Sequence, residues 1–228
     1  VGDRSTASVQ LETGDLDIMS IDPSQLVSFE NNDKFTVEKV QTLKTALLAI
    51  NTTVAPLDNK LVRQAMTYAV DKQSIITIAY ENCAVPARLQ ANDTNCFGVD
   101  FSDATDFSYN PEKAKELLAE ADEDAESGNF ALMTQTLSYR ADFSYNVCHY
   151  GSVGIGGNNF CQMKDAWVDE MFAKAESEQD EEVRKDIYRE LIAYLVDYCP
   201  SIPLFHHELV YAWNSQLNAT VHDSSVHP

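Results

Sequence analysis

Residues 51–76 read NTTVAPLDNKLVRQAMTYAVDKQSII, which predicts an extended segment, a turn and two capped helices in succession. Asp58 is placed to cap the first helix, because its side-chain oxygen can accept a hydrogen bond from a free amide of the first turn. Asp71 is placed to cap the second helix in the same way. Apolar residues recur at helical spacing between the two caps and form one stripe: Leu61, Val62, Ala65, Met66, Ala69 and Val70. The stripe indicates helices packed on a core rather than a cofactor-binding motif.

The rest of the chain alternates between strand patterns and capped helices. Residues 35–40 alternate between apolar and polar side chains, and residues 130–134 have the composition of a buried strand. Further helices are expected after Asn110, Asp165 and Asp180. The last of them is expected to bury one face, made of Val183, Ile187, Leu191, Ile192 and Leu195. This order of elements predicts an α/β fold with a mixed sheet flanked by helices.

The charge of the chain excludes some partners. With 36 acidic and 16 basic residues the net charge is -20, whereas phosphate binding requires a basic face, so we expect no nucleic-acid partner. No apolar run approaches the length of a membrane span. The chain begins at Val1 without an initiator Met or a signal peptide, and we expect a processed protein or a piece of a longer one.

The five cysteines form no Cys-x-x-Cys pair, so the sequence gives little support to a structural zinc site. Cys83 and Cys96 are 13 residues apart, and so are Cys148 and Cys161. Two disulfides in an oxidising compartment would fit this spacing, with Cys199 left buried. Five reduced and mostly buried thiols would fit it as well.

Residues 51–76 resemble the signature of the family 5 extracellular solute-binding proteins, which deliver peptides, nickel and similar cargo to ABC transporters. Tyr109-Asn-Pro-Glu-Lys-Ala-Lys-Glu-Leu-Leu-Ala-Glu-Ala121 resembles a second motif of that family. The resemblance extends from about Thr6 to about Asn218, with one departure. After residue 122 the family normally has some tens of residues that this sequence lacks.

The resemblance implies a periplasmic-binding-protein-like type II lobe, truncated relative to the full two-lobe protein. Residues 1–45 would be a remnant of the large lobe, residues 46–207 the smaller ligand-binding lobe, and residues 208–228 a return segment to the large lobe. It also implies an extracytoplasmic, monomeric protein that works with ABC permease subunits. Membrane attachment would come only through an N-terminal lipoprotein part that this sequence does not contain. The dipeptide-binding members carry a cysteine pair that matches Cys148 and Cys161, which implies a disulfide there.

The element Tyr139-Arg140-Ala141-Asp142 resembles the Trp-x-Ala-Asp motif of peptide-binding members, whose aspartate receives the α-ammonium group of the ligand. In a closed cleft a carboxylate that faces an ammonium group gains a charge-assisted hydrogen bond. From the residues alone, Asp142 could equally be an exposed loop residue or a helix cap. The nearby side chains Phe143, Tyr145 and Asn146, together with Tyr139, could line the cleft or belong to the core.

Two other functions stay open at this stage. His206 and His207, with His149, suggest a metal-chelate (nickel-type) binding protein on the same scaffold. Adjacent histidines on an extended segment point to opposite faces, however, so a direct metal site is not expected. A secreted hydrolase would need two facing carboxylates, and no spacing singles out such a pair. We therefore expect a binding protein without cofactor or metal, and not an enzyme.

Overall fold

The computed structural model describes residues 3–91, 96–121, 132–138 and 142–221. Its helices and strands, in chain order, are α1 (Arg4–Thr13), β1 (Ile18–Ile21), η1 (Pro23–Gln25), α2 (Leu26–Glu30), β2 (Phe35–Ile50), α3 (Lys60–Ala69), α4 (Lys72–Tyr80), β3 (Ala84–Pro86), α5 (Pro111–Glu120), β4 (Leu132–Ser138), η3 (Phe143–Asn146), α6 (Val147–Tyr150), η4 (Ser152–Gly154), α7 (Ala166–Ser177), α8 (Glu181–Tyr198) and β5 (Ser201–Asn214). The predicted α/β class is confirmed. Within the described parts of the chain, no helix combines the length and hydrophobicity that crossing a bilayer would require.

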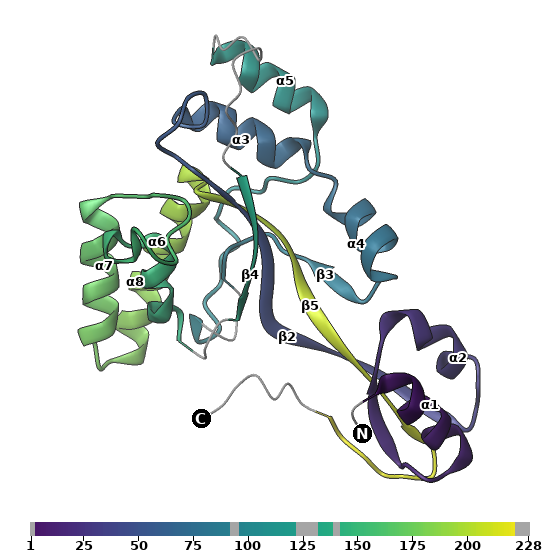
Figure 1. The fold of residues 1–228 in the computed structure, drawn as a ribbon. Helices are drawn as coiled ribbons and strands as arrows, with labels where there is room; N and C mark the ends of the chain where they lie inside the picture. The colour runs from purple at the N-terminus through teal and green to yellow at the C-terminus, as the bar shows by residue number, and fades with distance from the viewer. Residues whose placement is uncertain (1–2, 92–95, 122–131, 139–141, 222–228) are drawn as a thin grey trace.

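One curled sheet connects the whole structure (Figure 1). Its strand order is β1-β5-β2-β4, with β3 also pairing with β5, and the pairings between these strands are antiparallel. The two long strands β2 and β5 pair along most of their length, from Phe35 opposite Asn214 to Ala49 opposite Ser201. Their register shifts between Gln41 and Thr45. These two strands therefore carry the chain from one end of the molecule to the other.

Helices cover both faces of the sheet beyond this shift. Leu43, Leu47 and Ala49 of β2 belong to the largest hydrophobic cluster, which includes the inner faces of α7 and α8. The alternate positions Ala46 and Ile50 pack instead with residues of α4 and α3. This division follows from the strand geometry, because successive side chains point to opposite faces of a sheet.

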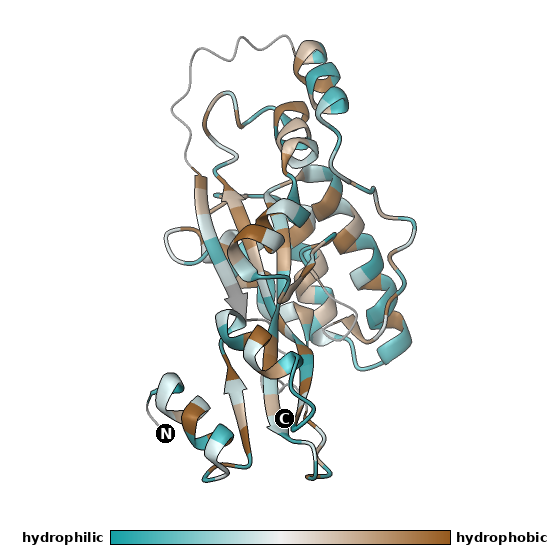
Figure 2. Ribbon diagram, turned by 90° about the vertical axis from the view of Figure 1, so that its right-hand side faces the viewer, coloured by the Kyte–Doolittle hydropathy of each residue, from teal (hydrophilic) through white to brown (hydrophobic). Residues whose placement is uncertain are grey.

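A separate hydrophobic cluster forms at the other end of β2 and β5. It joins α1, β1 and α2 to the outer ends of the two long strands and consists of Ala7, Leu11, Met19, Ile21, Leu26, Phe29, Cys83, Val210 and Ala212. Figure 1 shows these N-terminal elements set apart from the helices around β4, and in Figure 2 the strands at the centre carry mostly hydrophobic residues. The chain thus has two packed regions linked by one two-stranded ribbon.

Most predicted helix starts are confirmed, and two local predictions are wrong. Asp71, Asn110, Asp165 and Asp180 each accept a hydrogen bond from an amide of the helix that follows. The cap of α3 is Asn59 and not Asp58, because the side chain of Asn59 accepts from the amide of Leu61. The predicted buried strand is the edge strand β4, and the residues from Leu132 to Thr136 are exposed or only partly buried, since only β2 pairs with it.

Candidate functional site

Asp142 lies at the start of η3, shortly after the end of β4. Its side chain accepts a hydrogen bond from the amide of Ser144 at 2.9 Å and so caps this short helix. The expectation that Asp142 could be a cap is therefore confirmed. Tyr139, Arg140 and Ala141, the other residues of the predicted binding element, lie outside the described residues.

Two side chains of α8 also bind the Asp142 carboxylate. Arg184 forms an ion pair with it, with Nη1 and Oδ2 2.9 Å apart, and the Tyr188 hydroxyl donates to its Oδ1. The side chains of Arg184 and Asp142 are 21% and 24% exposed, so the pair is neither fully buried nor in bulk solvent. Burial and then the bond to Asp142 raise the pKa of Tyr188 above its usual range, which keeps this hydroxyl a donor.

Arg184 is itself fixed by its surroundings. Its Nη2 donates to the carbonyl oxygen of Glu178 at 2.6 Å, and its guanidinium lies 5.6 Å from the centre of the Phe97 ring. Its Nε is buried and has no hydrogen-bond partner among the residues that the structure describes. The guanidinium is thus held by α8, the segment before α8 and an aromatic ring, and it presents one edge to Asp142.

This arrangement fixes the orientation of the Asp142 carboxylate. It accepts from the Ser144 amide, the Tyr188 hydroxyl and the Arg184 guanidinium. A carboxylate offers about four acceptor positions, so the described residues leave one position for a further donor. An incoming ammonium group would meet a carboxylate that needs no reorientation, although it would share the charge of Asp142 with Arg184.

The neighbouring candidate residues divide between core and surface. Phe143 is 0% exposed and Asn146 is 2% exposed. The ring of Phe143 lies 6.1 Å from that of Phe172 and 6.0 Å from that of Tyr188, so it belongs to the core. Tyr145 is 54% exposed and lies on the surface. Among these described residues, Tyr145 is the one whose side chain is open to a ligand.

Comparison with known proteins shows the family. The family model described as bacterial extracellular solute-binding proteins, family 5 (middle), matches residues 1–148. The chain belongs to this family. Heme-binding protein A of Haemophilus influenzae is 36% identical over 122 residues, which are 53% of this chain and 22% of that protein. The dipeptide-binding protein of Escherichia coli is 32% identical over 120 residues, which are 52% of this chain and 22% of that protein.

The fold of this family 5 chain agrees with solved structures. The ABC transporter substrate-binding protein CtaP of Listeria monocytogenes superposes with a TM-score of 0.81 at 17% identity. That superposition covers 94% of this chain and 54% of CtaP. The chain therefore spans about half the length of this structure, and its matches to the curated relatives cover less than a quarter of theirs. The periplasmic-binding-protein-like fold expected from the resemblance is confirmed.

The predicted disulfides are absent, because Cys83, Cys148 and Cys161 of this family 5 chain are free thiols and neither predicted pair is joined. Cys83 packs in the N-terminal cluster and Cys96 in the largest cluster, so the first pair is divided between two packed regions. Cys148 turns its sulfur toward the carbonyl oxygen of Tyr145 at 3.3 Å. Burial raises the pKa of Cys161 to about 12. The spacing of 13 residues therefore reflects no cross-link in the structure.

The two adjacent histidines point to opposite faces of β5, as expected. The His206 ring is hydrogen-bonded to the hydroxyl of Thr45 on β2, with 2.8 Å between Nδ1 and Oγ1. The His207 ring packs against Tyr80 of α4 and against Phe205. Among the described residues, no group of three or more histidines, cysteines and carboxylates is arranged to hold a metal ion.

Sequence reasoning missed Arg184 and Tyr188, the two partners of Asp142. The predicted apolar face of α8 was only partly right, because Val183 is 46% exposed whereas Tyr188 is 0% exposed. Arg184 and Tyr188 are four residues apart and therefore share one face of the helix. A basic and an aromatic residue at this spacing, beside a buried stripe, is the signal that could have identified them.

Proposed function

We propose that the chain is the ligand-binding part of a substrate-binding component of an ABC importer, and that its cargo is a peptide. The observation that carries this proposal is the family membership. The dipeptide-binding relative and the ABC transporter protein of the same fold support the finer statement. Binding would supply specificity without a covalent step, and the closed, loaded form would deliver the peptide to the permease.

The proposed lobe boundaries follow the expected ones. Residues 46–207 would form the ligand-binding lobe, and residues 1–45 and 208–228 would belong to the other lobe. Two observations support this division: the N-terminal cluster is separate from the largest cluster, and the β2–β5 register shifts between Gln41 and Thr45.

In this proposal Asp142 receives the α-ammonium group of the peptide, beside Tyr139, Arg140, Ala141 and Tyr145. Its carboxylate is already held by Arg184 and Tyr188, so binding would require little loss of side-chain freedom. A ligand with a blocked amine would leave the remaining acceptor position of Asp142 unused in a closed cleft. Burial of an unpaired polar group costs about 1–3 kcal/mol, which would discriminate against such ligands.

The test is calorimetry of the complete gene product with peptides of two to five residues, free or N-acetylated. We expect the free peptides to bind and acetylation to weaken binding about tenfold or more. Asp142→Asn, which keeps the shape of the side chain, should weaken the binding of the free peptides by a similar factor. Equal binding of free and acetylated peptides, with no effect of Asp142→Asn, would refute the role of Asp142.

Asp165→Asn is a matched control. Asp165 also caps a helix and also accepts from a tyrosine, since the Tyr194 hydroxyl lies 2.5 Å from its Oδ2. The substitution should therefore disturb the fold about as much as Asp142→Asn and leave peptide affinity unchanged. A loss of affinity in both variants would indicate a general effect on folding.

A metal chelate is the second candidate cargo, because the heme-binding relative shares 36% identity with this chain. Titration of the same protein with hemin and with a nickel–histidine complex distinguishes the two. Tight binding of a chelate without peptide binding would replace the peptide proposal. We further propose an extracytoplasmic, monomeric protein anchored as a lipoprotein, which cell fractionation and gel filtration would test.

A further inference from the structure

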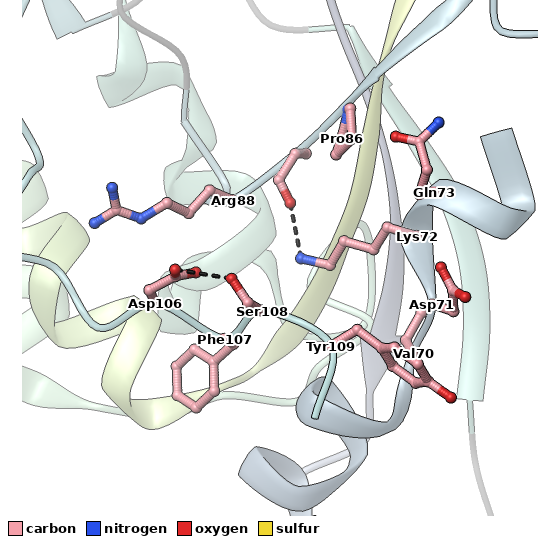
Figure 3. A pocket seen from close by; sticks show the side chains of 11 residues that line it. Val70, Asp71, Lys72, Gln73, Pro86, Arg88, Asp106, Phe107, Ser108 and Tyr109 are labelled. Carbon is pink, nitrogen blue, oxygen red and sulfur yellow. Dashed lines mark hydrogen bonds between the residues drawn. The ribbon is translucent and has the colours of Figure 1, made fainter. Parts of the chain in front are cut away.

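A cavity of about 390 Å³ opens on the side of the molecule that carries α4 (Figure 3). Three segments line it: residues 70–73, where α4 begins, residues 86–88, where β3 ends, and residues 106–109, before α5. Its volume lies at the lower end of the range typical of small-molecule sites. Neither Asp142 nor its partners Ser144, Arg184 and Tyr188 line this cavity, so it is separate from the site around Asp142.

The side chain of Lys72 extends into the cavity toward the segment 86–88 (Figure 3). Its Nζ donates to the carbonyl oxygen of Ala87 at 2.8 Å, and Ala87 is completely buried. An ammonium group has three donors, so two are left without an acceptor in the described parts of the chain. No carboxylate of the described residues forms an ion pair with Lys72. The cavity therefore contains a partly desolvated cation whose hydrogen-bond partner is a neutral carbonyl.

The electrostatic cost of this burial is visible in the lysine itself. Loss of solvation lowers the pKa of Lys72 to about 8, although Asp106 and, to a smaller extent, Cys199 act in the opposite direction. At neutral pH the amine is still protonated in most molecules. An anion placed beside it would restore the interactions that burial removes.

The other charged groups of the cavity are already engaged. Asp106 accepts from the hydroxyl of Ser108 at 2.8 Å, and Asp71 accepts from the amide of Ser74 at 2.9 Å. Arg88 donates to the carbonyl oxygens of Phe101 and Ala104, at 2.7 and 2.6 Å, and so fixes the segment that leads to Asp106.

The charges of the lining residues limit what the cavity can accept. Lys72 and Arg88 are balanced by Asp71 and Asp106, so the lining carries no net charge. One negative charge can be placed at Lys72, whereas a dianion would be repelled by the two carboxylates.

We propose that this cavity binds a small organic monocarboxylate, whose carboxylate accepts hydrogen bonds from the two N–H groups of Lys72 that no described residue engages. The short apolar part of the ligand would lie against Val70 and Pro86, which also line the cavity. The exposed side chains of Gln73 and Tyr109 stand at its edge, so a ligand can enter from solvent. Charge-assisted hydrogen bonds are the strong component of such binding.

The experiment uses the complete gene product with isotope-labelled lysine and follows the ε-CH₂ signal of Lys72 by NMR. Acetate and butyrate should shift this signal saturably, whereas the neutral analogue butyramide should not, and inorganic phosphate should bind more weakly than butyrate. Binding of butyrate should weaken about tenfold between pH 7 and pH 9, because Lys72 loses its proton over this interval.

Three variants decide the role of the charges. Lys72→Met should weaken butyrate binding about tenfold or more, as measured on the neighbouring amide signals, and Lys72→Arg should retain most of the binding. Asp106→Asn should strengthen binding when measured at pH 6, where Lys72 stays protonated even though the loss of the Asp106 charge lowers its pKa further, because the substitution removes a negative charge from the wall. Lys60→Met, which changes an exposed lysine of α3, should have no effect. If Lys72→Met fails to fold, Lys72→Arg and Asp106→Asn remain decisive. Butyrate that leaves the Lys72 signal unchanged, or that binds Lys72→Met as tightly as the parent, would overturn the proposal.

Discussion

Replacement of Arg63 tests how the helix pair α3 and α8 is held together. Arg63 belongs to the segment 51–76 and is 1% exposed. Its Nη1 donates to the carbonyl oxygens of Leu57 at 2.8 Å and Asp58 at 3.0 Å, in the turn before α3. Its Nη2 donates to the carbonyl oxygen of Tyr198 at 2.7 Å. Its Nε donates to the carbonyl oxygens of Tyr198 and Cys199, both at 3.1 Å. One guanidinium therefore satisfies carbonyls at the C-terminal end of α8, where a positive charge is also favourable.

Arg63→Met keeps an unbranched apolar side chain of similar length but leaves four carbonyl oxygens without their donor. Each unsatisfied buried group costs about 1–3 kcal/mol. Water can reach some of these carbonyl oxygens in the variant, so we take about 1 kcal/mol for each of the four. The expected loss in the free energy of unfolding is then about 4 kcal/mol. Arg63→Lys keeps the charge but cannot reach the turn and α8 at once, and should lose about 2 kcal/mol.

The assay is urea denaturation of the complete gene product, followed by far-UV circular dichroism. Lys60→Ala is the matched control on the same helix, because Lys60 pairs with Asp197 of α8 at 2.8 Å while both side chains are about half exposed. An exposed pair contributes less than about 1 kcal/mol. The reasoning fails if Arg63→Met stays within about 1 kcal/mol of the parent, or if the Lys60 variant loses as much.

Three further predictions follow from single contacts. Tyr188→Phe should lower peptide affinity in calorimetry about threefold to tenfold and stability by about 1 kcal/mol, whereas Tyr194→Phe should lower stability alone. Burial, together with a nearby lysine, lowers the pKa of His207. As the pH falls, His207 therefore takes up its proton at a higher pH in the unfolded chain than in the folded one. The urea midpoint should fall as the pH drops below about 6.5, and His207→Phe should make the midpoint less dependent on pH. Gly154→Ala would place its Cβ 2.0 Å from a carbonyl oxygen of α6. It should lower the free energy of unfolding by about 2 kcal/mol or more, which a lower thermal midpoint would show. Gly157→Ala, whose nearest contact is 3.5 Å away, should cost less than about 1 kcal/mol.

Local features of the fold could be predicted because their causes are local. The caps at Asp71 and Asn110 follow from a side chain and an amide only three residues apart, and both are confirmed. The wrong cap of α3 shows the limit of this reasoning. Asp58 and Asn59 are both good capping residues, and the turn that precedes the helix selects the second one.

The surroundings of Asp142 could not be predicted, because its partners are distant in sequence. Arg184 and Tyr188 lie 42 and 46 residues further along the chain. Their contact with Asp142 depends on how α8 packs against η3, and residue spacing carries no information about this packing. The exposure of β4 has the same cause, since an apolar strand composition does not show whether a second neighbouring strand is present.

The interruption in the β2–β5 ribbon suits the hinge that the two proposed lobes require. Between Gln41 and Thr45 the register shifts, and the Thr42 hydroxyl forms a hydrogen bond to the opposite strand. It donates to the carbonyl oxygen of His207 at 3.0 Å and accepts from the amide of Lys44 at 3.1 Å. A hydroxyl can rotate and keep both partners while the strands twist, whereas regular ladder bonds would have to lengthen. Bending at this point leaves the regular register of the two flanking paired segments unchanged. For this reason we place the hinge of the proposed closure at Thr42.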